Sequence, residues 1–207
     1  MPKLPPKRLE SRRQAILEAA ERAFARDGFH GTSMQNICRE AGISPGTLYV
    51  YFPSKVALIA GLCERDRNEI KAALIEVENA PDILEALEEM LVHYACVEPH
   101  ERRALMFEIG AEALRNPDIA KLMTETDDAF TAMVRATVVG AAEAGRITPH
   151  GDIDTLFDLL SALGDGILWR ATLRPDRDNR GSIRRIFKLV RQQLLTSTTD
   201  TPLSCPA

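Results

Sequence analysis

Residues 32–55 read Thr-Ser-Met-Gln-Asn-Ile-Cys-Arg-Glu-Ala-Gly-Ile-Ser-Pro-Gly-Thr-Leu-Tyr-Val-Tyr-Phe-Pro-Ser-Lys, and this stretch decides the fold. It predicts one helix over 33–41 and a second, barely two turns long, over 45–51. Thr32 is expected to cap the first helix, with Gln35 completing a capping box. Gly42 suits the left-handed turn between the helices, and Ser44-Pro45 supplies a cap and a first-turn proline. Two short helices joined in this way predict a helix-turn-helix that reads DNA.

The side chains of this stretch divide into anchors and candidate contacts. Leu48 and Phe52 are expected to anchor the short helix in a core. Tyrosine hydroxyls can donate to phosphate oxygens, and the Thr47 methyl can touch a thymine methyl. Lys55 adds charge near a helix N-terminus, where an anion is already favoured. An alternative for Tyr49 stays open, because its ring could instead pack on the first helix.

The charge of the chain is unevenly distributed. The whole chain of 207 residues carries a formal net charge of −4, which argues against a protein that coats nucleic acid with its entire surface. Residues 1–55 nevertheless hold nine Lys/Arg and five Asp/Glu, whereas the remainder is acidic. A basic head on an acidic body predicts a polyanionic partner at one end only.

The rest of the chain shows helical periodicity throughout, which predicts an all-α protein of about nine helices. Besides the two helices above, the expected helices span 8–27, 54–77, 82–97, 100–115, 118–144, 152–173 and 181–197. Residues 1–7 are expected to form a flexible basic arm, 148–151 a turn and 198–207 a disordered tail. No strand is expected. The predicted domains are a DNA-binding head over 1–53 and a helical sensing and dimerisation domain over 54–197.

Several classes of protein are disfavoured by what the sequence lacks. The four cysteines (Cys38, Cys63, Cys96 and Cys205) are widely separated and form no Cys-x-x-Cys pair, so no zinc site, redox motif or other metal site is expected. No secretion signal and no apolar run of about 20 residues is present, which predicts a cytoplasmic protein without membrane partners. No cofactor is expected.

The head resembles the tetracycline-repressor (TetR) family of bacterial regulators. The resemblance rests on Ile16-Leu17-x-Ala19-Ala20-x-x-x-Phe24-x-x-x-Gly28-Phe29, on Thr32-Ser33, on Ala41-Gly42-Ile43-Ser44 and on Gly46-Thr47-Leu48-Tyr49-x-Tyr51-Phe52-x-Ser54-Lys55. It covers about residues 12–62. It implies a dimeric regulator, most simply a repressor, that binds a pseudo-palindromic operator and is released by a small-molecule inducer. The expected DNA contacts are Thr32, Ser33, Ser44, Pro45, Gly46, Thr47, Tyr49, Tyr51 and Lys55.

The body carries the expected interface and pocket. The last two helices are expected to pair with a second copy in a four-helix bundle. The expected interface residues are Leu156, Phe157, Leu160, Leu163, Gly164, Ile167, Leu168, Ile183, Ile186, Phe187, Val190 and Leu194. Large and adaptable apolar side chains are expected to line an inducer pocket. They are Met90, Tyr94, Met106, Phe107, Met123, Phe130, Met133 and Trp169.

Simpler interpretations of the body stay open beside the predicted interface and pocket. The last two helices could pack only within one chain, and each pocket residue could be ordinary core. A helical-bundle enzyme or binding protein with an appended DNA-binding head is the alternative function. It has little support, because Glu-x-x-His pairs, Gly-x-Ser-x-Gly and a phosphate loop are all absent from the sequence, so no catalytic residue is predicted.

Overall fold

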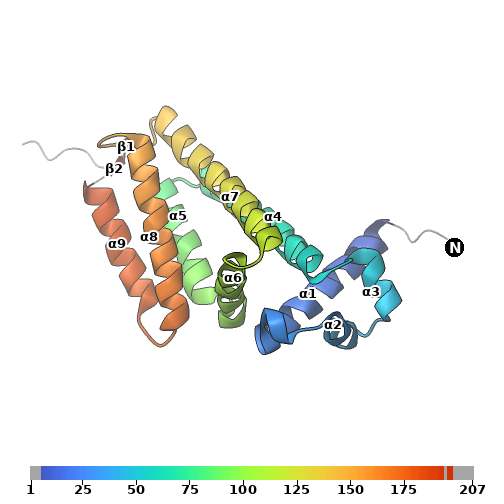
Figure 1. Cartoon of the computed structure of the whole chain (residues 1–207). Coiled ribbons are helices and arrows are strands. Elements are labelled where there is room, and N and C mark those ends of the chain that lie inside the picture. Colours follow the sequence, from blue (N-terminus) through green and yellow to red (C-terminus); the bar gives the residue numbers. More distant parts are fainter. Residues whose placement is uncertain (1–5, 194, 198–207) are drawn as a thin grey trace, which may run out of the picture. The chain divides into compact units, whose positions relative to one another are not determined.

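The computed structural model describes residues 6–193 and 195–197, in which nine α-helices account for nearly all regular structure (Figure 1). The helices are α1 (Pro6–Gly31), α2 (Met34–Ala41), α3 (Pro45–Tyr51), α4 (Lys55–Asn79), α5 (Ile83–Val92), α6 (His100–Ala113), α7 (Pro117–Glu143), α8 (Ile153–Leu173) and α9 (Asn179–Gln193). A π-helical segment, η1 (His93–Val97), follows α5 directly. The predicted all-α class is confirmed.

Two short strands were not predicted. β1 (Ile147–Pro149) pairs antiparallel with β2 (Leu195–Ser197), with Ile147 opposite Ser197. The expected turn at 148–151 is therefore wrong for residues 148 and 149, although residues 150 and 151 form a bend, and the expected continuation of the last helix to Ser197 is wrong. Helix α1 begins at Pro6, inside the expected arm, because proline is tolerated in the first turn of a helix. The remaining arm residues 1–5 and the expected tail 198–207 lie outside the described residues.

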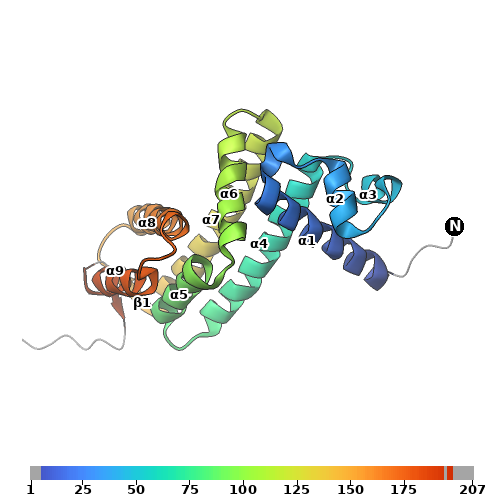
Figure 2. The ribbon, with the colours of Figure 1, turned by 90° about the horizontal axis from the view of Figure 1, so that it is seen from below.

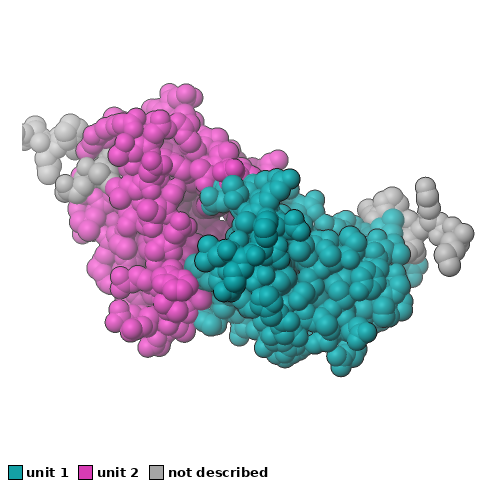
Figure 3. Space-filling view, viewed as in Figure 1, with its two compact units in different colours: residues 1–68, 99–127 teal, residues 69–98, 128–207 magenta. Residues whose placement is uncertain are grey.

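The chain divides into two compact units (Figure 3). Unit 1 comprises residues 1–68 and 99–127, and unit 2 comprises residues 69–98 and 128–207. Helices α4 and α7 each continue from one unit into the other. The expected domain boundary at residue 53 falls inside unit 1, and its meaning as a division between DNA reading and sensing stays a prediction.

Unit 1 is built around the apolar face of α1. Ile16, Leu17, Ala20 and Phe24 are all buried there against residues of α2, α3, α4 and α6. Leu48 and Phe52 are buried in the same cluster, which confirms both as anchors. A Cβ added to Gly61 would lie 2.8 Å from Leu17 Cδ2 and 2.9 Å from Phe52 Cε1. Position 61 therefore needs glycine for α4 to pack closely on α1.

Unit 2 holds two smaller apolar clusters. One gathers Leu84, Val138, Leu156 and Val190, and the other gathers Val92, Ala95, Ala171 and Ile183. Helices α8 and α9 lie side by side in both views of the ribbon (Figures 1 and 2).

Charge pairs fix α9 to α5 within this unit. Arg191 donates to both carboxylate oxygens of Asp82, at 2.8 and 3.1 Å, and Arg184 pairs with Glu88 and Glu89. Across residues 6–193 and 195–197, no single helix is long and apolar enough to cross a membrane, and only α3 and α4 together, bent by 54°, reach that length and composition.

Candidate nucleic-acid interface

Helices α2 and α3 form a capped helix-turn-helix. The cap of α2 is Ser33, whose hydroxyl accepts the Asn36 N–H at 3.1 Å. Gly42 adopts the left-handed conformation at φ 62°, and the Ile43 N–H closes the turn onto the Cys38 carbonyl at 3.0 Å. Ser44 caps α3 by accepting the Thr47 N–H at 3.2 Å, with Pro45 in the first turn. The predicted motif is confirmed, but its first cap is Ser33 rather than Thr32.

The outward face of α3 is uncharged and open. Pro45, Gly46, Tyr49 and Val50 are exposed along it, and a Cβ added to Gly46 would meet nothing within 4 Å. Tyr49 is 52% exposed, so it is not a buried core residue, and the alternative that its ring packs partly on the first helix stays open. Tyr51 is the tyrosine that packs against the core of unit 1, and it is half-buried. Only one of the two predicted tyrosines therefore projects freely.

Val50 was missed by the sequence analysis. Its side chain is 82% exposed, the highest exposure of any large apolar residue on α3. An apolar side chain on a reading helix can contact the 5-methyl group of thymine. Its spacing in the sequence could have identified Val50 as part of the outward face, because Val50 follows Gly46 by four residues and so shares a helix face with it.

The hydroxyl groups near α3 are mostly engaged in capping. Ser44 Oγ and Thr47 Oγ1 lie 2.9 Å apart, and one of the two hydroxyls donates to the other. Ser33 and Ser44 are exposed and Thr47 is half-buried, so all three keep some surface. One hydroxyl proton of the Ser44–Thr47 pair is left for a phosphate oxygen, whereas Ser33 Oγ already donates to Asn36 Oδ1 at 2.5 Å.

Two of the predicted contacts have internal roles instead. Thr32 is 1% exposed and its hydroxyl is directed at the carbonyls of Gly28 (2.7 Å) and Ala23 (3.0 Å), so the expectation that it contacts phosphate is wrong. The Lys55 amine donates to the carbonyls of Phe29 at 2.7 Å and Thr32 at 3.0 Å. It also lies 4.3 Å from the centre of the Phe29 ring. One of its three N–H donors is left for a phosphate.

Helix α1 contributes free cations near its start. Arg8 and Arg12 are exposed, whereas Arg13 is half-buried, donates to Glu64 at 2.6 Å and lies over the Phe52 ring. Arg8 and Arg12 are thus the better candidates for a contact with the DNA backbone.

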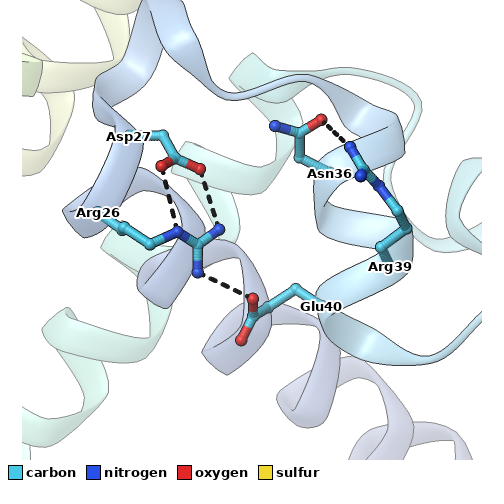
Figure 4. A pocket seen from close by; sticks show the side chains of 5 residues that line it. All are labelled: Arg26, Asp27, Asn36, Arg39 and Glu40. Carbon is cyan, nitrogen blue, oxygen red and sulfur yellow. Dashed lines mark hydrogen bonds and ion pairs between the residues drawn. The ribbon is translucent and has the colours of Figure 1, made fainter.

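A polar pocket of about 380 Å³ lies where α1 meets α2. Figure 4 shows Arg26 between two carboxylates: it donates to Asp27 at 2.9 and 3.1 Å and to Glu40 at 3.1 Å. Arg39 in turn donates to Asn36 at 2.9 Å. Hydrogen bonds from Arg22 and Arg26 hold the pKa of Glu40 below its usual range. This pocket is a salt-bridged seam between two helices, and it is unlike an apolar ligand site.

The predicted inducer-pocket residues do not share one unit. Met106, Phe107 and Met123 belong to unit 1, and the other five belong to unit 2. Met123 packs against the core of unit 1 and Met90 against a core of unit 2. Trp169 is 48% exposed. None of the eight lines the seam of Figure 4, and the pocket stays a prediction.

The predicted interface residues mostly face the interior of their own chain. Leu156, Phe157, Ile183 and Val190 are buried, while six more are half-buried against the cores of unit 2. Those six are Leu160, Leu163, Ile167, Leu168, Ile186 and Phe187. Gly164 is half-buried, and Leu194 lies outside the described residues.

The alternative that the predicted interface residues pack within their own chain therefore holds for Leu156, Phe157, Ile183 and Val190. The amphipathic pattern identifies a face that must be covered, but it does not say by which partner.

A different apolar face of these helices remains uncovered. Leu159, Trp169 and Leu173 on α8 and Leu189 on α9 are 44%, 48%, 58% and 59% exposed. On α8 they are joined by the exposed small residues Ala162 and Gly166. The spacing 159, 162, 166, 169, 173 places all five on one side of the helix.

A capped helix-turn-helix with an open, uncharged reading face, set in an all-helical chain, defines a DNA-binding regulator. Family patterns agree: "Bacterial regulatory proteins, tetR family" matches residues 16–62, and "BetI-type transcriptional repressor, C-terminal" matches residues 84–195. The chain belongs to the TetR family of transcriptional regulators.

Individual relatives are similar over most of their length. The HTH-type transcriptional regulator UidR of Escherichia coli K12 is 36% identical over 75% of this chain and 79% of its own. The HTH-type transcriptional repressor AcnR of Corynebacterium diphtheriae is 28% identical over 95% of this chain and 98% of its own. The solved structure of Salmonella enterica GusR has a TM-score of 0.72 at 31% identity, covering 86% of this chain and 94% of GusR.

Proposed function

We propose that this protein is a homodimeric repressor whose two heads read the half-sites of a pseudo-palindromic operator and whose body binds a small molecule that releases the DNA. The observation that carries the proposal is the outward face of α3, which presents Tyr49, Val50 and a bare helix tip at Gly46. A DNA-bound regulator acts on the chromosome, so we place the protein in the cytoplasm.

The chemistry of the head supports operator reading. Tyr49 and Val50 offer a hydroxyl, a ring and methyl groups to base edges in the major groove. Ser33 and Ser44 at the starts of α2 and α3, with Thr47, offer hydroxyl groups, while Arg8 and Arg12 supply charge for phosphates. Residues 42–52 at the α2–α3 tip are uncharged, so electrostatic attraction must come from neighbouring cations, such as the exposed Arg8 and Arg12 of α1 and Arg39 of α2.

DNA footprinting upstream of the protein's own gene tests this part. We expect one protected palindromic site and a binding constant that falls steeply with salt. Arg12→Gln should reduce the salt slope by about 1, and Tyr49→Ala should reduce selectivity among sequences. Binding without sequence preference in the unmodified protein would overturn the proposal.

The uncovered face of α8 and α9 supports the dimer. A C2 axis would pair this face with itself, because both copies then present the same apolar stripe. Charge favours the same arrangement: Asp158 on α8 is exposed, as are Arg185 and Lys188 on α9. Two heads held by such an interface can meet successive major grooves of a palindrome.

Membership of the TetR family supports the proposal that a small molecule releases the protein from its DNA. An effective ligand must bind the DNA-free state more tightly than the DNA-bound state. Reciprocity gives the test: any molecule that lowers operator affinity must itself bind less tightly when operator is present. Screening apolar metabolites by thermal unfolding, followed by this paired titration, separates inducers from molecules that merely stabilise the fold.

A further inference from the structure

The segment that leads into α2 is a tight turn, Gly28–Thr32, held from several sides. Gly28 has φ 74° and ψ 168°, which ends the regular part of α1. The Thr32 hydroxyl donates to the Gly28 carbonyl, and the Lys55 amine spans the carbonyls of Phe29 and Thr32. Ser33, the cap of α2, follows immediately. The conformation of this turn therefore fixes where α2 begins.

Two carboxylates of α6 hold the outer side of the same turn. Glu108 Oε1 accepts the Phe29 N–H at 2.6 Å, and Glu112 Oε2 lies 2.6 Å from His30 Nε2. A Cβ on Gly28 would lie 2.7 Å from Glu108 Oε1, so the carboxylate occupies the space that a side chain would need. Glu108 and Glu112 are four residues apart and share one face of α6.

These two carboxylates are not needed merely to hold α6 against the core of unit 1. Leu105 and Ile109 already bury α6 in the core of unit 1, at 4% and 1% exposure. Glu112 is only 6% exposed, and burying a carboxylate is expensive unless its partners are well placed. Well-packed apolar residues often stabilise such a position equally. A carboxylate adds geometric specificity, because its oxygen holds one N–H group in a defined position.

We propose that Glu108 and Glu112 are positioning residues for DNA reading: they hold the turn Gly28–Thr32 in the form that presents α2 and α3 to the operator. A shift of α6 by about 1.5 Å along its axis, the rise of one helical residue, would strain or lengthen both 2.6 Å contacts. This inference rests on the proposed operator function.

Variants at the two positions test the proposal. We expect Glu108→Ala and Glu112→Ala to weaken operator binding at least tenfold, measured by fluorescence anisotropy on the footprinted site. Glu108→Gln should recover most of the affinity, because its amide oxygen can still accept the Phe29 N–H. The matched control is Glu101→Ala, an exposed glutamate on the same helix, which should leave binding unchanged.

Hydrogen exchange separates positioning from general stability. In Glu108→Ala the Phe29 amide should exchange faster while core amides of α1 keep their protection. In the unmodified protein, operator DNA should slow exchange at Phe29, since coupling between two sites is reciprocal. This measurement needs no variant, so it remains decisive if an alanine variant fails to fold.

The outcomes are distinct. Unchanged operator affinity in both alanine variants, or a Phe29 amide indifferent to operator, would overturn the positioning role. If the unmodified protein bound no DNA selectively, the operator function itself would fail. Loss of binding in Tyr49→Ala with full binding in Glu108→Ala would leave operator reading intact and remove only this inference.

Discussion

Val50 is 82% exposed and lies next to Tyr49, near the C-terminal end of α3. If it contacts a thymine methyl, Val50→Ala should weaken operator binding by about 1 kcal/mol, roughly fivefold, from lost apolar contact. Replacing the contacted thymine by uracil removes the methyl group and should weaken binding similarly. Because both changes remove one contact, their combination should be no worse than either alone. Additive losses would contradict the contact, and Val97→Ala, 56% exposed in unit 2, is the control.

Lys55 should act on stability as well as on DNA. Its amine holds two carbonyls and the Phe29 ring, and burial lowers the pKa of this amine, opposed by the negative charge of Glu112. We expect Lys55→Met to lower the free energy of unfolding by about 1.5–3 kcal/mol, the range for hydrogen bonds to charged groups. Arg12→Met, at an exposed cation of α1, should instead weaken DNA binding with unfolding unchanged. Urea denaturation of the two variants distinguishes these roles, and equal stability of Lys55→Met and the parent would refute ours.

At the scale of elements, Asp82 both caps α5 and ties it to α9. It accepts the backbone N–H groups of Leu84 and Glu85 at 3.0 Å, and the Arg191 hydrogen bonds are the main cause of its lowered pKa. A lowered folded pKa means that Asp82 stabilises the fold above the unfolded pKa of about 3.9 and loses this effect as the pH falls through the folded value.

Asp82→Asn keeps the cap and removes the ion pair. We expect a loss of roughly 1 kcal/mol at pH 7, in the range for partly exposed pairs, that shrinks below about pH 4. Asp82→Ala should lose about 1 kcal/mol more, because the cap is also gone. Urea denaturation at pH 7 and pH 3 measures both, and a loss in Asp82→Asn that is independent of pH would show that the charge does not matter.

Helix ends with local signals were predictable from the sequence. Ser44-Pro45 and Gly42 act on residues close to them in the sequence, so their roles are visible in the chain. The pairing of β1 with β2 was not predictable, because it joins positions 147 and 197. The hold of Glu108 on Phe29 spans 79 residues and was equally hidden. Thr32 shows a local limit: two adjacent hydroxyl residues, Thr32 and Ser33, suited the cap, and only burial decides between them.

At the scale of the whole molecule, the residues that the sequence predicted for a dimer interface lie mostly on the inner face of α8 and α9, and the interface itself stays a prediction. Periodicity marks Leu156 and Phe157 as strongly as Leu159, because several apolar rows run along α8. Burial distinguishes these rows, because Leu156 and Phe157 are 7% and 6% exposed, whereas Leu159 is 44% exposed. A second copy should therefore cover Leu159, Trp169, Leu173 and Leu189, and the buried rows should affect folding instead.

Leu159→Glu tests this division between folding and assembly. A carboxylate on the uncovered stripe would be desolvated in a dimer, beside Asp158 of the same helix, and solvated in a monomer. Sedimentation equilibrium at micromolar concentration should show a dimer for the parent and a monomer for Leu159→Glu, with the helical circular dichroism unchanged. Operator affinity should fall as well, because a monomer reaches one half-site only. The matched control is Leu114→Glu, which changes a leucine that is 87% exposed on unit 1 and should remain dimeric. A monomeric parent, or a dimeric Leu159→Glu, would mean that α8 assembles through another face or not at all.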